Sequence, residues 1–409
     1  MARSRSLVAA ASLRALACAA LAVIYPALAS AQSIRVNPNG GAPFTDLQAA
    51  IDAAPHGATI RVQGGTWGPL VVRRSVRLIG EPTFEIFVQG QSLAGSGGIA
   101  QDRALTLLGS GQDELELSHC TIHGRVPGPL FAQCFPAISG GGFRSIRIVS
   151  SLIEAPRWQN VTGLAVGQPA ISLAPGAHLW LADTAVVGGT SYDCCGSAFR
   201  FGPRGGAAIE ASGCRVTALD SQIRGGDGLA TYWSFFPPSN NACPCPANAP
   251  FDSRGGAGVV AEILLEANSS ITGGLGGEVW FDPGFGFQPW GRQPDGPAAD
   301  VTRRITWTDD VTVTYGRSLG GVVQLKDLSG LFSLVVMGLP ATEPFELGGG
   351  EWVYVDVLGP VIAQGLPANG QISIAVPRDV NLIGAMLATH FAGPPPTALS
   401  RPLITAIRF

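Results

Sequence analysis

The sequence predicts an all-β protein: a right-handed parallel β-helix with a short N-terminal capping helix, followed by a small β-sandwich. Three observations predict this class. A degenerate repeat of short β-type runs fills the middle of the 409-residue chain. One short amphipathic helix precedes these runs, and alternating strands with turns rich in Gly and Pro follow them. We divide the chain into residues 1–31, 32–304 and 309–409.

The first of these segments has the composition of an export signal. Three arginines are the only charged residues before a small, apolar run over Ala15–Tyr25, and Ala29-Ser30-Ala31 has the small-x-small pattern that a signal peptidase cleaves. An apolar core of about 11 residues is too short to cross a bilayer, which needs about 20. We therefore interpret residues 1–31 as a signal peptide. A secreted, periplasmic or cell-surface protein, with no membrane segment after cleavage, is expected.

Charge is sparse and nearly balanced in this chain. Charged residues make up 13% of the sequence, and the formal net charge is −3. No stripe of Lys and Arg is present, which argues against a nucleic-acid partner. The sequence contains no GxSxG, HExxH or P-loop motif. We therefore predict no cofactor, no metal and no nucleic-acid partner, and we expect a monomer.

A capping helix is predicted near the start of the mature chain. Thr45 and Gln48 have the spacing of a capping box, and apolar residues recur on one helical face until Pro55-His56-Gly57 ends the pattern. Short β-type runs follow over residues 58–62, 70–72 and 76–79. A solenoid needs such a cap, because its first coil would otherwise expose unpaired backbone groups and an open apolar core.

The segment Thr45–Trp67, TDLQAAIDAAPHGATIRVQGGTW, closely resembles the N-terminal cap and first coil of pectin-lyase-like right-handed β-helix proteins. The resemblance implies that fold from about Ser33 onward. It implies no particular activity, because the motif occurs in lyases, hydrolases and proteins without known chemistry. The C-terminal segment is similar to the β domains appended to many exported proteins of GC-rich bacteria, and this looser similarity also implies no activity.

Five interior segments align as one repeat. In each, a polar residue expected in a tight turn precedes an aliphatic residue by three positions, and the last three close with Gly-Gly. Coils of about 20 residues with three short strands each fit a parallel β-helix, whose coils are about 4.8 Å apart. The segments are Ala104–Gly124, Ala137–Ala155, Ala170–Gly189, Ala208–Gly226 and Gly258–Gly274; the turn residues are His119, Ser150, Asp183, Asp220 and Asn268, and the aliphatic residues are Ile122, Ile153, Val186, Ile223 and Ile271.

Insertions separate the repeats and are expected to leave the coils from one corner. They cover residues 188–206, 225–256 and 273–298, with a shorter one over 124–136. Insertions at one corner of stacked coils project from one side, which is where repeat proteins usually bind partners. After about Asp309 the pattern changes to alternating runs that predict a compact β-sandwich. These runs are 311–315, 321–325, 331–337, 351–356, 371–376 and 403–409.

Asp183 and Asp220 occupy equivalent positions on neighbouring coils and are the first catalytic candidates. At about 5 Å apart, two carboxylates could share a proton or a calcium ion. The alternative, which we favour, is a polar ladder at a tight turn, because Asp, Asn and Ser stabilise such turns by bonding their own backbone. His119 and His123 are not expected to share a metal ion, since four residues of a strand span about 13 Å.

The insertions are rich in aromatic residues, and aromatic faces with a polar rim suit sugar rings. Arg204 and Arg254, which precede Gly-Gly in two similar insertion ends, could orient hydroxyls or carboxylates of a ligand. The alternative is that these long loops need a small core of their own, pinned by cysteines. The ligand-binding candidates are Tyr192, Phe201, Tyr232, Trp233, Phe251, Trp280 and Trp290.

Seven of the eight cysteines follow the signal peptide, so at least one is unpaired. Export favours disulfides over zinc, because Cys243-Pro-Cys245 has one intervening residue and no matching second pair. We expect two bridges between the insertions, joining Cys194 and Cys195 to Cys243 and Cys245. A third bridge could join Cys120 to Cys134, and Cys214 is expected to be a buried thiol.

Taken together, these patterns favour an exported, non-catalytic β-helix protein whose aromatic loop face binds polysaccharide. One alternative is a polysaccharide lyase or glycoside hydrolase that uses Arg200, Arg204 or Arg254 with Asp183, Asp220 or Asp227. The other is a structural cell-envelope protein. The acids are expected mostly in turns and loops, with no strand that gathers several acids beside an Arg or Lys, and this weighs against catalysis.

Overall fold

The fold is taken from a computed structural model. It describes residues 33–86, 104–124, 135–156, 164–165, 167–193, 204–234, 253–282, 288–307, 311–314, 322–327, 331–338, 340–348, 351–355, 358, 361–367, 369–375, 386–393, 399–400 and 403–406. The predicted signal peptide lies outside these residues. The chain divides into two compact units, of which one is Ile34–Arg304 and the other contains Ile305–Phe409.

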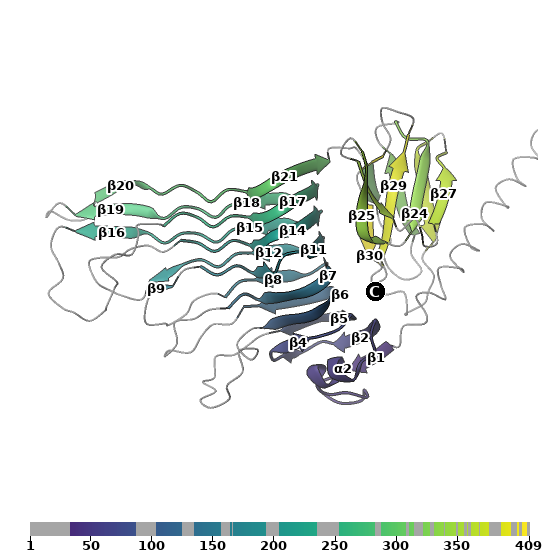
Figure 1. Ribbon diagram of the computed structural model, residues 1–409, viewed down its shortest axis with the longest axis horizontal. Coiled ribbons are helices and arrows are strands. Elements are labelled where there is room, and N and C mark those ends of the chain that lie inside the picture. The colour runs from purple at the N-terminus through teal and green to yellow at the C-terminus, as the bar shows by residue number, and fades with distance from the viewer. Residues whose placement is uncertain are drawn as a thin grey trace, which may run out of the picture. The chain divides into compact units, whose positions relative to one another are not determined.

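The first unit is built on one large, mainly parallel sheet (Figure 1). Successive strands of this sheet come from successive passes of the chain, an arrangement compatible with a β-helix. Sixteen strands of the described part belong to it: β1 (Ser33–Val36), β2 (Ala58–Gln63), β3 (Thr66–Trp67), β4 (Leu70–Val72), β5 (Val76–Ile86), β6 (Leu105–His123), β7 (Ile138–Val149), β8 (Leu152–Glu154), β10 (Ile171–Leu173), β11 (His178–Ala182), β12 (Ala185–Val187), β14 (Ile209–Leu219), β15 (Gln222–Arg224), β17 (Val259–Ala267), β18 (Ser270–Thr272) and β21 (Ala299–Trp307).

The register of these strands confirms the repeat that the sequence predicts. The aliphatic residues that follow the turn pair in parallel from coil to coil: Ile122 with Ile153, Val186 with Ile153, and Ile223 with Val186 and Ile271. The first strands of the repeats pair in the same order, through Leu105, Ile138, Ile171, Ile209 and Val259. Equivalent residues therefore stack directly on one another.

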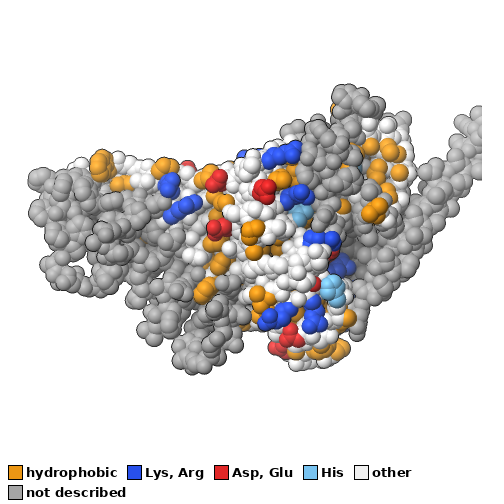
Figure 2. Space-filling model, viewed as in Figure 1, with side chains coloured by type: hydrophobic (Ala, Val, Ile, Leu, Met, Phe, Trp, Pro, Cys, Tyr) orange, Lys and Arg blue, Asp and Glu red, His pale blue; other side chains and the backbone are white. Residues whose placement is uncertain are grey.

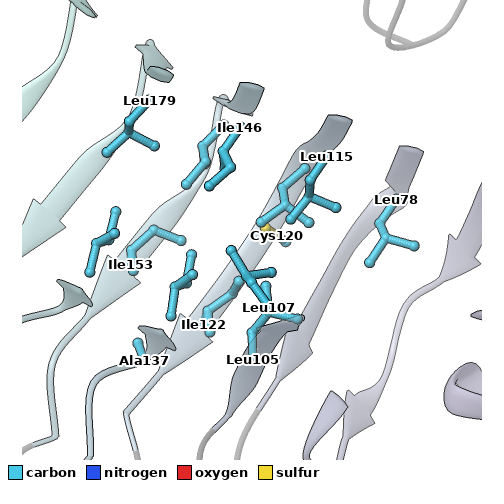
Figure 3. Packing of buried hydrophobic residues seen from close by; sticks show 14 of the residues in the cluster. Leu78, Leu105, Leu107, Leu115, Cys120, Ile122, Ala137, Ile146, Ile153 and Leu179 are labelled. Atoms are coloured by element: carbon cyan, nitrogen blue, oxygen red, sulfur yellow. The ribbon is translucent and has the colours of Figure 1, made fainter. Parts of the chain in front are cut away.

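Stacking places the same side of every coil in the core. Leu115, Ile146 and Leu179 follow one another in register, and Figure 3 shows them, together with Leu78 of the preceding coil, as inward side chains. Each of these four side chains is buried. Burial of aliphatic side chains is the main stabilising contribution, because each contributes about 1.5–3 kcal/mol relative to exposure.

The helix that closes the first coil is α2 (Leu47–Ala53), one residue shorter at its start than the capping-box pattern predicts. Its N-cap is Asp46, whose carboxylate accepts a hydrogen bond from the Ala49 N–H at 2.6 Å. Asp is a stronger N-cap than Thr, so the Thr45–Gln48 capping box is wrong. Gln48 instead bonds both backbone groups of Val71 in β4, at 2.8 and 3.1 Å. This amide attaches the helix to the sheet.

Two smaller sheets form from the insertions of the first unit. One pairs β9 (Leu164–Ala165), which lies between two repeats in a segment not predicted as an insertion, with β13 (Tyr192–Asp193). The other contains β16 (Thr231–Ser234), β19 (Glu278–Asp282) and β20 (Gln288–Arg292), which we call the tip sheet. Figure 1 shows the tip sheet at the end of long extended segments that leave the main sheet.

In the second unit, all the described strand pairs are antiparallel. Its three sheets have the orders β22-β23-β28, β27-β24-β29-β30 and β25-β26, and Val335, Phe391 and Leu403 are among its buried residues. All six predicted runs contain strands, whereas β25, β27 and β29 were not predicted. The strands are β22 (Val311–Thr314), β23 (Val322–Asp327), β24 (Leu334–Gly338), β25 (Pro340–Gly348), β26 (Glu351–Val355), β27 (Val361–Gly365), β28 (Gln371–Ala375), β29 (Met386–Ala392) and β30 (Leu403–Ala406).

No helix among the described residues has both the length and the apolar character needed to cross a bilayer.

Candidate functional site

The turn ladder holds the first pair of candidate carboxylates. Asp183, Asp220 and the equivalent His119, Ser150 and Asn268 all have left-handed backbone, with φ of 50°, 47°, 53°, 48° and 49°. Asp and Asn tolerate this conformation better than most residues with a Cβ. The Ser150 hydroxyl donates to Asp183 at 3.0 Å, and the Asn268 amide donates to Asp220 at 2.7 Å. Turn geometry therefore accounts for both carboxylates without a catalytic role.

A second ladder, which sequence reasoning missed, lies one residue further along each coil. Ser151, Thr184, Ser221 and Ser269 each donate a side-chain hydroxyl to the carbonyl two residues earlier. Three of these hydroxyls also accept the backbone N–H of the equivalent residue in the preceding coil: Ser151 from Cys120 at 3.2 Å, Ser221 from Thr184 at 3.3 Å and Ser269 from Ser221 at 3.1 Å. The signal was present in the sequence, because a hydroxyl follows four of the five turn residues.

The fifth position of this hydroxyl ladder is Cys120, and it corrects one predicted disulfide. The thiol is free and buried, and it donates to the Ser151 hydroxyl at 3.4 Å. Burial raises its pKa to about 12. An inward side chain cannot close the insertion that follows, so the predicted bridge to Cys134 does not fit. Cys214 is free and buried, as predicted.

The other predicted disulfide cysteines, Cys134, Cys194, Cys195, Cys243 and Cys245, lie outside the described residues, and their pairing remains a prediction.

Glycine pairs carry the insertions away from the main sheet. The chain passes outward and returns, and the outgoing and returning segments alternate in one backbone ladder with N···O distances of 2.8–2.9 Å. A Cβ at Gly256 would lie 2.0 Å from the carbonyl oxygen of Gly206, and at the other glycines of the array the nearest carbonyl oxygen would lie 1.9–2.9 Å from the added Cβ. We call this array the glycine ladder; it runs through Gln168, Gly189, Gly206, Gly226, Gly256, Gly274 and Gly296.

The tip sheet brings together four of the predicted ligand-binding residues. Tyr232 and Trp233 in β16 pair in register with Trp280 and Phe281 in β19. The antiparallel partner of Trp280 in β20 is Pro289, and the register shifts between Val279 and Trp280. This shift is a bulge that leaves Trp290 as the extra residue of β20. Tyr192 belongs to the separate sheet of β9 and β13, and Phe201 and Phe251 lie outside the described residues.

Trp290 is the most exposed tryptophan for which the structure gives a value, at 68% of its surface. A bulge aims a side chain out of the regular alternation of a strand. All five residues of β20 are exposed, and Figure 2 shows hydrophobic side chains on the visible surface at the β19–β20 end of the unit. The tip sheet thus presents a large apolar ring to solvent.

The charged side chains around Trp290 bond within the protein. Arg292 donates from Nε to the Gly276 carbonyl at 2.8 Å, and its guanidinium lies 3.7 Å from Asp295. Asp295 also accepts the Gly276 N–H at 2.8 Å. Glu278 accepts the indole N–H of Trp280 at 3.1 Å. These bonds hold the start of β19 and the end of β20 in place.

The structure places Arg204 and Arg254 on the returning segments, just before the glycine ladder. Both residues are exposed. Their carbonyl oxygens accept the N–H groups of Gly167 and Gly205, each at 3.0 Å. The equivalent backbone position in the next coil is Pro294, two residues after the end of β20. The two arginines are therefore distant from Asp183 and Asp220 along the coil, and these four catalytic candidates do not form one site.

A cluster of acids and arginines does occur on the outer face of the sheet, contrary to expectation. Glu114 and Glu116 are in β6. They lie beside Arg77 of β5 and beside two arginines of β7, Arg144 and Arg147. Arg77 donates two hydrogen bonds to Glu116, at 2.9 and 3.1 Å, and Arg144 contacts Glu114 at 2.8 Å. The Glu116 carboxylate raises the pKa of Arg77, whereas burial lowers that of Arg147. The acids are thus held in ion pairs.

Ser75, His56 and Asp113 form another cluster that the sequence did not predict. The His56 Nε2 lies 3.0 Å from both Asp113 Oδ1 and Ser75 Oγ. A catalytic triad needs the two imidazole nitrogens to face different partners, whereas here one nitrogen faces both. Ser75 is buried and its hydroxyl accepts the Glu114 N–H at 2.8 Å. Hydrogen bonds from Ser110, Ser75 and His56 outweigh burial and lower the pKa of Asp113. The cluster is a structural joint.

Within the described ranges, no three His, Cys, Asp or Glu side chains are grouped so that they could hold a metal ion. His123 is flanked by Glu85 and Glu154, each 3.1 Å from a different ring nitrogen. Because the two carboxylates lie on opposite sides of the ring, they do not converge with it on one point.

No protein-family model matches the chain, and no match is found among curated proteins.

Proposed function

We propose that this chain is an exported right-handed parallel β-helix protein that binds polysaccharide through its tip sheet and does not cleave it. The parallel register of equivalent residues supports the β-helix, and the antiparallel sheets of the second unit support a C-terminal β-sandwich. The apolar N-terminal segment with its small-x-small pattern supports export.

The observation that carries the binding function is the exposure of Trp290 beside an aromatic register row. Tyr232 and Trp280 occupy neighbouring positions of that row, and Trp290 is 68% exposed at the bulge next to it. Contiguous exposed apolar surface can mark an interaction site, and neighbouring Pro289 and Trp290 are both exposed in β20. An aromatic ring buries a large apolar area against the flat C–H face of a sugar.

The binding function is favoured over catalysis because the candidate acids already have partners. Asp183 and Asp220 belong to the turn ladder, and Glu114 and Glu116 are ion-paired with arginines. A general acid or base must reach the proton that it transfers, within about 2.6–3.2 Å. These carboxylates would first have to leave their present partners.

A glycan array, run beside lyase and reducing-sugar assays on the bound glycans, tests this proposal. We expect binding of at least one polysaccharide without release of unsaturated products or reducing ends. Cleavage of a bound glycan would support the lyase or hydrolase alternative. Absence of binding across the array would favour the structural-envelope alternative.

A further inference from the structure

We infer that the ligand of the tip sheet is an uncharged polysaccharide, bound through the apolar faces of its sugar rings. This inference rests on the proposed function and specifies the class of its ligand. It follows from three features of the sheet: the exposed indole of Trp290, the internal pairing of the neighbouring charges, and the form of the edge strand β20.

The exposed indole supplies the attraction. Trp290 occupies the extra position of a bulge, outside the regular alternation of the strand, and 68% of its surface is exposed. Neighbouring Pro289 and Gly291 are also exposed, and they are too small to shield the indole from a ligand. Contact between the indole and the apolar face of a sugar removes both apolar surfaces from water.

The neighbouring charges disfavour an acidic polysaccharide. Arg292, the described cation on the strands of the tip sheet, already bonds the Gly276 carbonyl and faces Asp295. Glu278 is engaged by the Trp280 indole N–H. A carboxylated or sulfated polymer at Trp290 would meet two carboxylates together with a cation whose donors are partly committed. Electrostatic complementarity is therefore poor for an anion, and a neutral chain meets no such penalty.

The edge strand disfavours a polypeptide. At the β20 edge, a protein strand could extend the sheet only by regular backbone pairing with β20. Pro289 has no N–H to donate, and the bulge at Trp290 interrupts the register. Proline and bulges are the usual means by which edge strands avoid such pairing. The surface thus suits a ligand that binds by ring contacts and does not need backbone pairing.

Affinity measurements with neutral and acidic polysaccharides test the inference. The probes are the neutral chains cellulose, mannan and chitin and the acidic chains polygalacturonate and alginate, each at low and high salt. We expect a neutral chain to bind with an affinity that changes little with salt, because no ion pair is formed. Trp290→Ala is expected to weaken it by about tenfold or more, from the loss of buried aromatic area. Trp290→Phe is expected to retain part of the affinity.

Two matched variants separate the indole from general effects. Leu108→Ala removes another exposed apolar side chain, from β6 of the main sheet, and is expected to leave binding unchanged. The double variant Arg204→Ala/Arg254→Ala removes the two exposed cations of the returning segments and is also expected to leave neutral binding unchanged. Circular dichroism confirms that each variant is folded.

The possible results distinguish this inference from the function on which it rests. Salt-sensitive binding of an acidic chain that depends on Arg204 and Arg254 but not on Trp290 would overturn the inference and leave polysaccharide binding intact. Neutral binding that is unaffected by Trp290→Ala would overturn the assignment to the tip sheet. Failure of every probe to bind would count against the proposed function itself.

Discussion

Five consecutive coils of the main sheet each turn at one residue with left-handed backbone. Asp183 and Asp220 occupy two of these positions, and their side chains bond to the equivalent residues of neighbouring coils. The backbone requirement and the side-chain ladder both favour short polar residues. A β-branched residue fits neither, because its Cβ substituents clash in this conformation.

Substitution at Asp220 tests this interpretation. We expect Asp220→Asn, alone or with Asp183→Asn, to leave the free energy of unfolding within about 0.5 kcal/mol of the wild type. Asp220→Val should lower it by about 1–2 kcal/mol because of the left-handed backbone. Urea unfolding measures both. A valine variant as stable as the wild type would refute the backbone argument, and unfolding of the Asn variants would imply a role for the charge.

A buried histidine makes the stability of the first unit depend on pH. The Trp180 indole N–H donates to His178 Nδ1 at 2.8 Å, so this nitrogen is unprotonated, and Nε2 lies 2.9 Å from the Thr217 hydroxyl. Burial, followed by the nearby Arg215 and Arg147, lowers the pKa of His178 well below 6.5. The unfolded chain therefore binds a proton at His178 at a pH where the folded chain does not.

Stability should therefore decrease as the pH falls below about 6.5, the ordinary pKa of histidine. The contribution of His178 approaches about 1.4 kcal/mol per pH unit below that value. The free energy of unfolding of His178→Gln should depend less steeply on pH than that of the wild type between pH 6.5 and 5.5. Urea unfolding at one fixed temperature measures both. Equal slopes for the two proteins would contradict the assignment of a neutral, buried imidazole.

At the scale of elements, the glycine ladder positions the tip sheet. Its outgoing and returning segments approach so closely that a carbonyl oxygen occupies the space of a Cβ at successive positions. Insertions of different length can then follow one common path before they diverge. The Gly-Gly repeats were visible in the sequence, but their alternation in one ladder was not, because it joins segments that lie far apart along the chain.

Alanine substitution within the ladder should be costly. In Gly256→Ala the new Cβ would lie 2.0 Å from the Gly206 carbonyl oxygen, a backbone atom that cannot turn aside. We expect a loss of about 2–3 kcal/mol or more in the free energy of unfolding. Gly68→Ala is the matched control, because no atom lies within 4 Å of its added Cβ. A Gly256→Ala variant with the stability of Gly68→Ala would show that the ladder is not closely packed.

At the scale of the whole molecule, sequence periodicity predicted the stacked coils but not the surroundings of the side chains. The row of Ile122, Ile153, Val186, Ile223 and Ile271 was predictable because the same spacing recurs in every coil. The joint of His56 with Asp113 was not, because a single contact between residues 57 positions apart leaves no periodic signal. In the second unit β25, β27 and β29 were missed, although alternation identified the other six strands.

The candidate site was predictable only in part, for the same reason. The abundance of aromatic residues in the insertions pointed to Trp280 and Trp290, but the bulge that exposes Trp290 depends on pairing between β19 and β20. The Cys120 thiol was misplaced because its position in the hydroxyl ladder depends on contact with the next coil. Features set by contacts between coils thus escaped prediction more often than features set by spacing along the chain.

Oxidative footprinting of the tryptophans with and without a bound polysaccharide tests the central claim most directly. The glycan is the one that binds most tightly in the array, added at saturation, and oxidation is located by mass spectrometry. Protection of Trp290 on binding is predicted, with no change at buried Trp180, whose ring is enclosed in both states. Oxidation of Trp290 at the same rate with the glycan bound would contradict the claim that the tip sheet is the binding surface.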